Sequence, residues 1–242
     1  MSVFTIADLH LSLNTSTNKS MDVFGRRWQG YTEKLEKNWR AVVADNDTVI
    51  LPGDISWALS TEEAAADFAF LHSLPGKKLV GKGNHDFWWQ TMRKLNAFTV
   101  MHRFDSISFL FNNAFPVEDL IVTGTRGWFY DSSSDNIPPD TDFKKITERE
   151  AGRLTLSLEQ GKKLQREYPE HEIVVFLHFP VTWGGKTLDP LMDVLLRYGI
   201  RRCYFGHIHG SYDMPMEFEE KGVQFSLISA DFLNFVPKIV QK

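Results

Sequence analysis

The sequence has little cysteine and no excess of positive charge, and each shortage excludes a class of protein. Its 242 residues include one cysteine, Cys203, so a disulfide framework cannot hold the chain together. The formal net charge is −4 and the pI is about 6.1. The global basic field that attracts nucleic acid is therefore missing, and we do not favour a nucleic-acid partner.

Long hydrophobic runs are missing as well. No apolar run approaches the ~20 residues that cross a bilayer, and the start Met-Ser-Val-Phe lacks the regions of a signal peptide. We expect a cytoplasmic protein without a membrane partner. The hydrophobic fraction, 43%, is sufficient for a core, and no linker, repeat or low-complexity tract divides the chain. The sequence therefore predicts one domain over residues 1–242.

The first ninety residues alternate between apolar runs and helical patterns. The runs 2–7, 48–51 and 77–81 predict buried strands. Apolar residues at helical spacing over 35–43 predict one intervening helix, and a capping box that begins at Ser60 predicts another. Strands that alternate with helices favour an α/β fold with parallel neighbours.

Beyond residue 90 the pattern changes. The runs 99–101, 106–111 and 120–123 are short and β-like, with no helix predicted between them, which favours a mixed sheet. A capping box at Thr147 predicts a helix that starts there and continues to about Tyr168.

Alternation returns in the last third of the chain. The runs 172–177 and 202–205 predict strands on either side of a helix that Asp189 is expected to cap. The runs 222–229 and 235–240 predict closing strands.

Polar side chains that bind metals or move protons follow five of these strands. They are Asp8 with His10, Asp54, Asn84 with His85, His178, and His207 with His209. Ligands bind at the carboxyl ends of strands in α/β sheets, so these side chains are candidates for one site. Carboxylate, amide and imidazole together suit Mn, Fe, Zn or Co better than Ca, and the set is large enough for two ions.

Each of these residues also has a structural explanation when it is taken alone. Asp8 or Asp54 could cap a following helix. His178 could be a core histidine with a satisfied hydrogen bond, and the segment 207–209 could be a turn. These separate structural explanations would all have to hold at the same time. We therefore favour a shared site.

The order of the motifs resembles that of the calcineurin-like metallophosphoesterase family. The segments read Asp8-x-His10, Gly53-Asp54, Gly83-Asn84-His85-Asp86, His178 and Gly206-His207-x-His209. The resemblance implies a hydrolase of phosphate esters with an α/β fold, a sandwich of two mixed β-sheets flanked by helices in four layers. After Gly53-Asp54 the sequence lacks the Asp-Arg pair of the Ser/Thr protein phosphatases, so it is more similar to the small bacterial-type members.

The resemblance also implies roles for individual residues at a centre of two divalent cations, with Mn, Fe or Zn expected. The implied ligands are Asp8, His10 and His209 for the first cation, Asp54 for both, and Asn84, His178 and His207 for the second. A hydroxide that bridges the two cations would attack the phosphorus. His85 would assist the leaving group, and Asp86 would orient His85.

The expected substrate is a small phosphate mono- or diester. Aromatic residues near the motifs, among them Trp57 and Trp88, would line either a cleft or the core, so a nucleotide substrate and a nuclease activity stay open. Arg126 could bind a substrate phosphate or form a surface salt bridge. A non-catalytic binding module on the same fold should have lost a ligand or His85, and this sequence keeps them all.

Two polar segments, 11–30 and 129–142, show no usable periodicity. We expect both to be loops, and the first is long enough to form a lid over a site.

Overall fold

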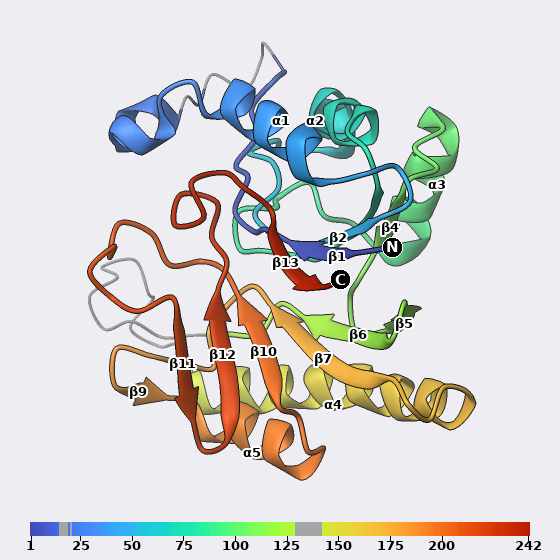
Figure 1. The fold of residues 1–242 in the computed structure, drawn as a ribbon, viewed down its shortest axis with the longest axis vertical. Helices are drawn as coiled ribbons and strands as arrows, with labels where there is room; N and C mark the ends of the chain where they lie inside the picture. Colours follow the sequence, from blue (N-terminus) through green and yellow to red (C-terminus); the bar gives the residue numbers. More distant parts are fainter. Residues whose placement is uncertain (15–18, 20, 129–141) are drawn as a thin grey trace.

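Two β-sheets pack face to face, and helices cover their outer faces (Figure 1). The structure is a computed structural model, and it describes residues 1–14, 19, 21–128 and 142–242. The fold is the predicted α/β sandwich of two mixed sheets in four layers. Most of segment 129–142 and part of segment 11–30, both predicted to be loops, lie outside the described residues.

The first sheet has five strands, four of them parallel. Their order is β13 (Lys238–Gln241), β1 (Val3–Thr5), β2 (Thr48–Leu51), β3 (Lys77–Val80) and β4 (Ile107–Phe109). β13 is the antiparallel edge strand beside β1. All four residues of β2 are buried, as expected for a parallel strand that is covered on both faces.

The second sheet has six strands with an antiparallel strand at each edge. Their order is β11 (Glu217–Glu220), β12 (Val223–Leu227), β10 (Arg202–Phe205), β7 (Glu172–Leu177), β6 (Leu120–Thr125) and β5 (Ala114–Val117). The central strands β12, β10, β7 and β6 are parallel. A separate hairpin joins β8 (Thr182–Trp183) to β9 (Lys186–Thr187).

The helices divide between the two outer faces (Figure 1). The helices on the first sheet are α1 (Tyr31–Val42), α2 (Thr61–Ser73) and α3 (Met92–His102), and those on the second are α4 (Phe143–Glu167) and α5 (Asp189–Arg197). Two 3-10 helices, η1 (Met21–Phe24) and η2 (Arg26–Trp28), precede α1. Within the described part of the chain, each helix is too short or too polar to cross a lipid bilayer.

The hydrophobic core has three layers. One layer packs the first helices against the first sheet, and another packs α4 and α5 against the second. The middle layer joins the sheets, with Val3 and Ile50 on one side and Val122 and Phe176 on the other. This shared layer supports our proposal that residues 1–242 form one domain.

The sequence prediction for residues 99–101 is wrong, because this run lies in α3. Thr91 caps the helix by accepting a hydrogen bond from Lys94 N at 3.4 Å, and Leu95 and Phe98 are its buried face. Burial of these two side chains at helical spacing outweighs the β propensity of the short run. The edge strands β5 and β11 were not predicted.

Two predicted helix starts are displaced. α4 begins four residues before Thr147, because Asp142 caps it by accepting from Lys145 N at 3.0 Å. The Thr147 hydroxyl instead donates to the carbonyl of Phe143 inside the helix. Asp189 is the first residue of α5 and not its cap.

Ser157 connects α4 to the second sheet, and its loss should destabilise the protein. The buried hydroxyl accepts from Gly124 N at 2.8 Å and donates to Asn113 O at 2.6 Å. Ser157→Ala leaves both backbone groups unpaired, so we expect the free energy of unfolding to fall by ~1–3 kcal/mol in chemical denaturation.

Thr155→Ala is the matched control for this prediction. The Thr155 hydroxyl donates to Ala151 O within α4, at 2.9 Å, and among the described residues it makes no hydrogen bond to another element. Its removal should change the free energy of unfolding by less than ~0.5 kcal/mol. Equal effects of the two substitutions would contradict the role given to Ser157.

Candidate metal centre

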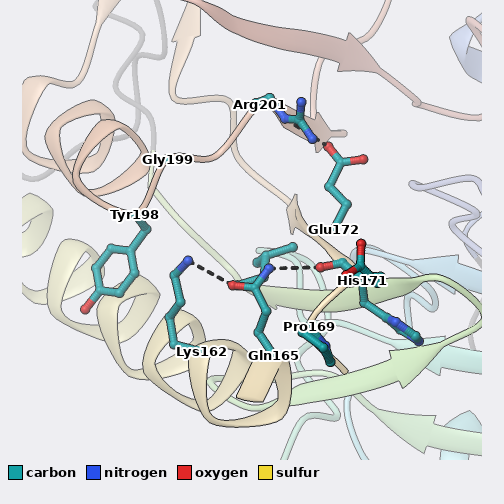
Figure 2. A pocket seen from close by; sticks show the side chains of 10 residues that line it. Lys162, Gln165, Pro169, His171, Glu172, Tyr198, Gly199 and Arg201 are labelled. Carbon is teal, nitrogen blue, oxygen red and sulfur yellow. Dashed lines mark hydrogen bonds and ion pairs between the residues drawn. The ribbon is translucent and has the colours of Figure 1, made fainter. Parts of the chain in front are cut away.

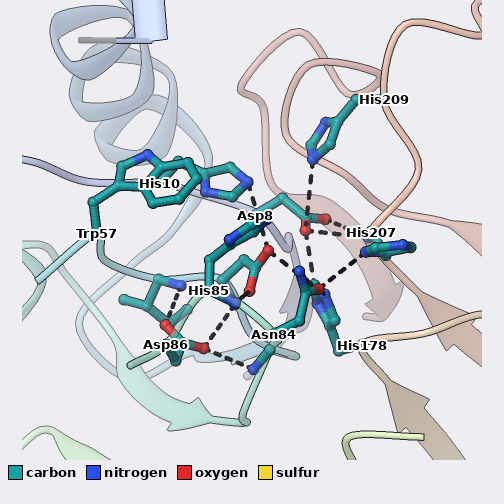
Figure 3. Close-up of polar contacts among 12 residues, drawn as sticks. Asp8, His10, Trp57, Asn84, His85, Asp86, His178, His207 and His209 are labelled. Atoms are coloured by element: carbon teal, nitrogen blue, oxygen red, sulfur yellow. Dashed lines mark hydrogen bonds and ion pairs between the residues drawn. The ribbon is translucent and has the colours of Figure 1, made fainter. Parts of the chain in front are cut away.

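The predicted site lies where the carboxyl ends of strands from both sheets meet. β1, β2 and β3 are parallel neighbours in one sheet, and β7, β10 and β12 are parallel neighbours in the other. Ala7, just after β1, joins the two sets: its N–H donates to Ile228 O, and its carbonyl accepts from Ala230 N, both at 2.9 Å. The side chains that follow these strands therefore converge (Figure 3).

Four of the predicted ligands have a left-handed backbone. The angle φ is 60° at Asp8, 46° at His10, 51° at Asp54 and 70° at His207. Such a conformation costs a non-glycine residue ~1–3 kcal/mol. Backbone hydrogen bonds hold it in place: Asp8 N donates to Gly53 O at 3.0 Å, and His10 N donates to Asp54 O at 2.9 Å. These turns direct the side chains out of the strands and toward the site.

Two glycines allow backbone to lie directly against the carboxylates. A Cβ atom on Gly83 would be 2.0 Å from Asp54 Oδ1, and one on Gly206 would be 2.3 Å from Asp8 Oδ2. Neither position can hold a side chain without displacing a carboxylate. The absence of a side chain at Gly206 allows the next residue, His207, to donate its N–H to Asp8 at 2.9 Å.

The first group of candidate ligands is Asp8, His10 and His209. One ligand atom of each lies within 4.8 Å of the others. His209 Nε2 is 3.8 Å from Asp8 Oδ1, and the ring centroids of His10 and His209 are 5.4 Å apart. The structure thus brings together the three residues that the family resemblance implied for the first cation.

The second group is Asn84, His178 and His207. Asn84 Oδ1 lies 2.6 Å from His178 Nε2 and 3.1 Å from His207 Nδ1. Each residue follows a different strand, yet the three side chains point toward one another (Figure 3). These are the residues implied for the second cation.

Asp54 lies between the two groups. Its Oδ2 atom is 3.7 Å from His10 Nε2 in the first group and 3.5 Å from His178 Nε2 in the second. Asp8 also approaches the second group, with Oδ1 3.7 Å from His178 Nδ1. A carboxylate in the position of Asp54 suits a ligand that two cations share.

The site concentrates acids and imidazoles, of which Asp8, His10, Asp54 and His178 are buried. Burial raises the pKa of the Asp8 carboxyl to about 6, and it raises the pKa of Asp54 above its ordinary value. Burial lowers the pKa of His10 and of His178, which keeps both imidazoles neutral near pH 7. A divalent cation stabilises buried carboxylates and binds neutral imidazoles, so the residues present fit metal ions.

His85 borders both groups. Its backbone N–H donates to Asp54 Oδ1 at 2.8 Å. Its half-buried ring lies 4.5 Å from the Trp57 ring, and Trp57 also stacks on His10 at 4.9 Å. Burial lowers the pKa of His85 to about 4, so the ring is neutral near pH 7. Trp57 therefore lines the site. The sequence predicted that it would line either a cleft or the core.

Asp86 holds the backbone of the site. Its buried carboxylate accepts hydrogen bonds from Asp54 N at 2.8 Å, from Gly83 N at 2.7 Å and from Trp88 Nε1 at 3.0 Å. It thereby ties together the two loops that carry Asp54 and Asn84. The orientation of the His85 ring by Asp86 stays a prediction.

Trp88 is fully buried and belongs to the core.

Arg126 is next to the second group but is not part of it. Its carbonyl accepts from His178 N at 3.1 Å. Its guanidinium Nη2 lies 3.8 Å from Oε1 of Glu150, and the Arg126 side chain is 19% exposed. The ion pair is therefore largely buried and is not the surface salt bridge considered from the sequence; contact with substrate stays a prediction.

Asp231 belongs to the site and was not predicted. Its buried carboxylate lies 2.9 Å from His209 Nδ1 and accepts from the Tyr212 hydroxyl at 2.9 Å. The contact with Nδ1 leaves Nε2 of His209 directed at Asp8. The signal was present in the sequence, because Asp231 follows the predicted strand 222–229 as the other site residues follow theirs.

A separate pocket lies at the amino ends of β7 and β10 (Figure 2). Lys162 donates to Gln165 at 3.0 Å on one side of it, and Arg201 Nε lies 3.9 Å from Glu172 Oε1 on the other. None of the predicted ligands lines this pocket, since all of them follow the carboxyl ends of strands.

Comparisons with known proteins identify the family of the chain. The model of the calcineurin-like phosphoesterase family matches residues 1–211, which include all the predicted ligands. Among the curated proteins, no match was found.

Two solved structures share the fold at low sequence identity. The chain is similar to the phosphopantetheinyl hydrolase PptH of Mycobacterium tuberculosis, with 16% identity, a TM-score of 0.51, and coverage of 94% of this chain and 88% of that one. It is also similar to the protein TT1561 of Thermus thermophilus, with 12% identity, a TM-score of 0.53, and coverage of 99% and 97%.

The family match extends over most of the sequence, and the structure brings the predicted ligands together in two groups that fit divalent cations. The chain belongs to the calcineurin-like phosphoesterase family, and it is a metal-dependent hydrolase of phosphate esters.

Proposed function

We propose that this protein hydrolyses small phosphate mono- or diesters at a centre of two divalent cations, with His85 assisting the leaving group. The observation that carries the proposal is the position of Asp54, whose Oδ2 lies 3.7 Å from His10 Nε2 and 3.5 Å from His178 Nε2. One carboxylate thus faces both groups of candidate ligands. A carboxylate in this position could serve as a ligand of both cations, as is usual at two-metal sites.

The residues of the two groups would hold the cations. The proposed ligands are Asp8, His10 and His209 for the first, Asp54 for both, and Asn84, His178 and His207 for the second. Bound there, the cations would lower the pKa of water and neutralise the phosphoryl oxygens. Mn, Fe and Zn are the metals that suit this mixture of ligands.

His85 supplies proton chemistry from the chain itself. Its ring is neutral near pH 7 and lies 4.5 Å from the Trp57 ring, beside the first group. A phosphate anion close to an imidazole raises the pKa of that imidazole. His85 would then hold a proton next to the leaving oxygen and donate it as the ester bond breaks.

A nucleotide is the second candidate for the substrate. Phe87 is 55% exposed, and its ring centroid lies 6.2 Å from that of His85. An exposed aromatic ring beside the proposed proton donor provides a surface on which a base can stack. Nucleoside phosphate esters therefore belong in the substrate assay together with simple aryl phosphates.

Replacing Asn84 and His85 separately tests the division of roles between them. Asn84→Ala should lower the metal content of the purified protein, because it removes an oxygen 2.6 Å from His178 Nε2. His85→Ala should retain the metals and slow hydrolysis of 4-nitrophenyl phosphate or its diester by ~10²–10⁴-fold. Metal content is measured by mass spectrometry; a His85→Ala protein that has lost its metals, or that keeps full activity, would overturn the assignment.

Metal binding should weaken in acid. The pKa of Asp8 is about 6, and the hydrogen bond to Asp231 raises the pKa of His209 despite its burial. Asp8 takes up a proton as the pH falls through about 6, and the raised pKa of His209 favours its protonated form, so a cation must displace both protons. Titration calorimetry should show Mn²⁺ affinity falling by about tenfold or more per pH unit below about pH 6. An affinity that stays constant from about pH 7.5 to about pH 5.5 would contradict ligation by these residues.

Asp231→Asn tests whether this carboxylate positions His209. We expect Mn²⁺ affinity to fall by ~10–100-fold, as is usual when the partner of a metal-binding histidine is lost. The melting temperature of the metal-free protein reports any general loss of stability. Asp193→Asn, on the exposed side of α5, is the control and should leave Mn²⁺ affinity unchanged. Equal losses in the two variants would rule out the positioning role.

A further inference from the structure

Three arginines surround one buried carboxylate beside the metal centre, and one lysine interacts electrostatically with the same group. The carboxylate is Glu150 of α4, which is 0% exposed. We call the cations the basic cluster; its members are Lys82, Arg126, Arg149 and Arg153. Lys82 precedes the loop of Asn84, Arg126 follows β6, and the other two belong to α4.

Glu150 holds the three arginines together through a single oxygen. Its Oε1 atom is 2.6 Å from Arg153 Nη1, 3.4 Å from Arg149 Nε and 3.8 Å from Arg126 Nη2. Among the described residues, Glu150 is the one carboxylate within 4.0 Å of any of these guanidinium groups. The carboxylate of Glu150 thus holds the three arginines together, but its single negative charge does not neutralise their positive charge.

Lys82 adds a further positive charge to the cluster. Its ammonium group interacts electrostatically with Arg126, Arg153 and Glu150 of the cluster, and with Asp86. The four cations and Glu150 sum to a formal charge of +3, and the other carboxylates that act on them are Asp86, on Lys82, and Asp54, on Arg126. The protein as a whole carries a net charge of −4. A concentration of positive charge of this kind attracts an anion.

The cluster also contains an unused hydrogen-bond donor. Arg126 Nε is buried and has no hydrogen-bond partner in the described structure. The Arg126 guanidinium lies 5.4 Å from the Trp128 ring and 5.9 Å from the Phe179 ring. Arg149 and Arg153 remain 53% and 34% exposed, so the cluster is open on the side of α4.

The basic cluster is continuous with the metal centre. The Phe179 ring, which the Arg126 guanidinium faces, lies 4.3 Å from the ring of His207. The Arg126 carbonyl accepts the N–H of His178 at 3.1 Å. The Phe179 ring thus lies between His207 of the second group and the Arg126 guanidinium, and it is within contact distance of both.

We propose that the basic cluster binds a second phosphoryl group of the substrate, next to the centre that hydrolyses the first. The substrate class is then a phosphate ester that carries another phosphate, such as a nucleoside bisphosphate. Several guanidinium groups match the three oxygens of a phosphoryl group, and their excess of charge suits a dianion better than a carboxylate. The substrate assignment rests on the proposed function, but anion binding by the cluster does not.

Binding of inorganic phosphate to the metal-free protein tests the cluster directly. The test variant is Lys82→Gln with Arg149→Gln, which leaves Arg126 and Arg153 paired with Glu150. The control is Lys163→Gln with Arg166→Gln, which removes the same charge from exposed positions farther along α4. Calorimetry at low ionic strength and about pH 8 keeps most imidazoles neutral.

We expect the wild type to bind phosphate, the test variant to bind it about tenfold more weakly or worse, and the control to bind it unchanged. The proposal is overturned if the wild type binds no phosphate, if both variants lose affinity equally, or if acetate binds as tightly as phosphate.

Inhibition of the metal-loaded enzyme tests the assignment to the substrate. Adenosine 3′,5′-bisphosphate should inhibit hydrolysis of 4-nitrophenyl phosphate more strongly than adenosine 5′-monophosphate, and the test variant should lose this difference while the control keeps it. Equal inhibition of the wild type by both nucleotides would overturn the assignment. A wild type that hydrolyses no ester would refute the proposed function, and the phosphate titration would still decide whether the cluster binds an anion.

Discussion

Two buried carboxylates, Asp8 and Asp54, impose the constraint on which the rest of the site depends. Each is at most 1% exposed, and burial raises the pKa of each. Backbone N–H groups of His207 and His85 donate to them, but hydrogen bonds alone compensate poorly for a charge removed from water. Neutral imidazoles crowd the same space. A divalent cation held by Asp8 and Asp54 would supply the positive charge that these buried carboxylates lack.

The same carboxylates connect the metal centre to the stability of the whole fold. Asp8 follows β1, and the adjacent Ala7 hydrogen-bonds to Ile228 and Ala230, which follow β12 of the other sheet, both at 2.9 Å. Candidate ligands come from both sheets, so cations bound between them would join the two halves of the sandwich. Binding to the folded chain alone would then stabilise it. The strained backbone at the strand ends is part of the same arrangement, since it directs the ligands to one point.

The sequence alone was sufficient to predict that the polar side chains that follow strand ends lie together. Asp8 and His178 follow apolar runs that are readily identified, and parallel pairing places such ends together. Other features depend on tertiary contacts that the sequence does not reveal. The run 99–101 has β propensity but joins α3, because burial selects the helix. Asp231 is 22 residues from His209 along the chain, and their contact depends on where the strands on either side lie in the folded sheet. The basic cluster likewise requires α4 to meet the end of β6.

The central claim is that residues from five strand ends form one centre with two cations. Electron paramagnetic resonance of the Mn²⁺-loaded protein tests it most directly, because the spectrum reports both occupancy and proximity. We predict two Mn²⁺ ions per chain with an exchange-coupled spectrum, as expected for ions ~3.5–4 Å apart that share a carboxylate. A single ion per chain, or two ions that give the spectrum of isolated Mn²⁺, would contradict the account.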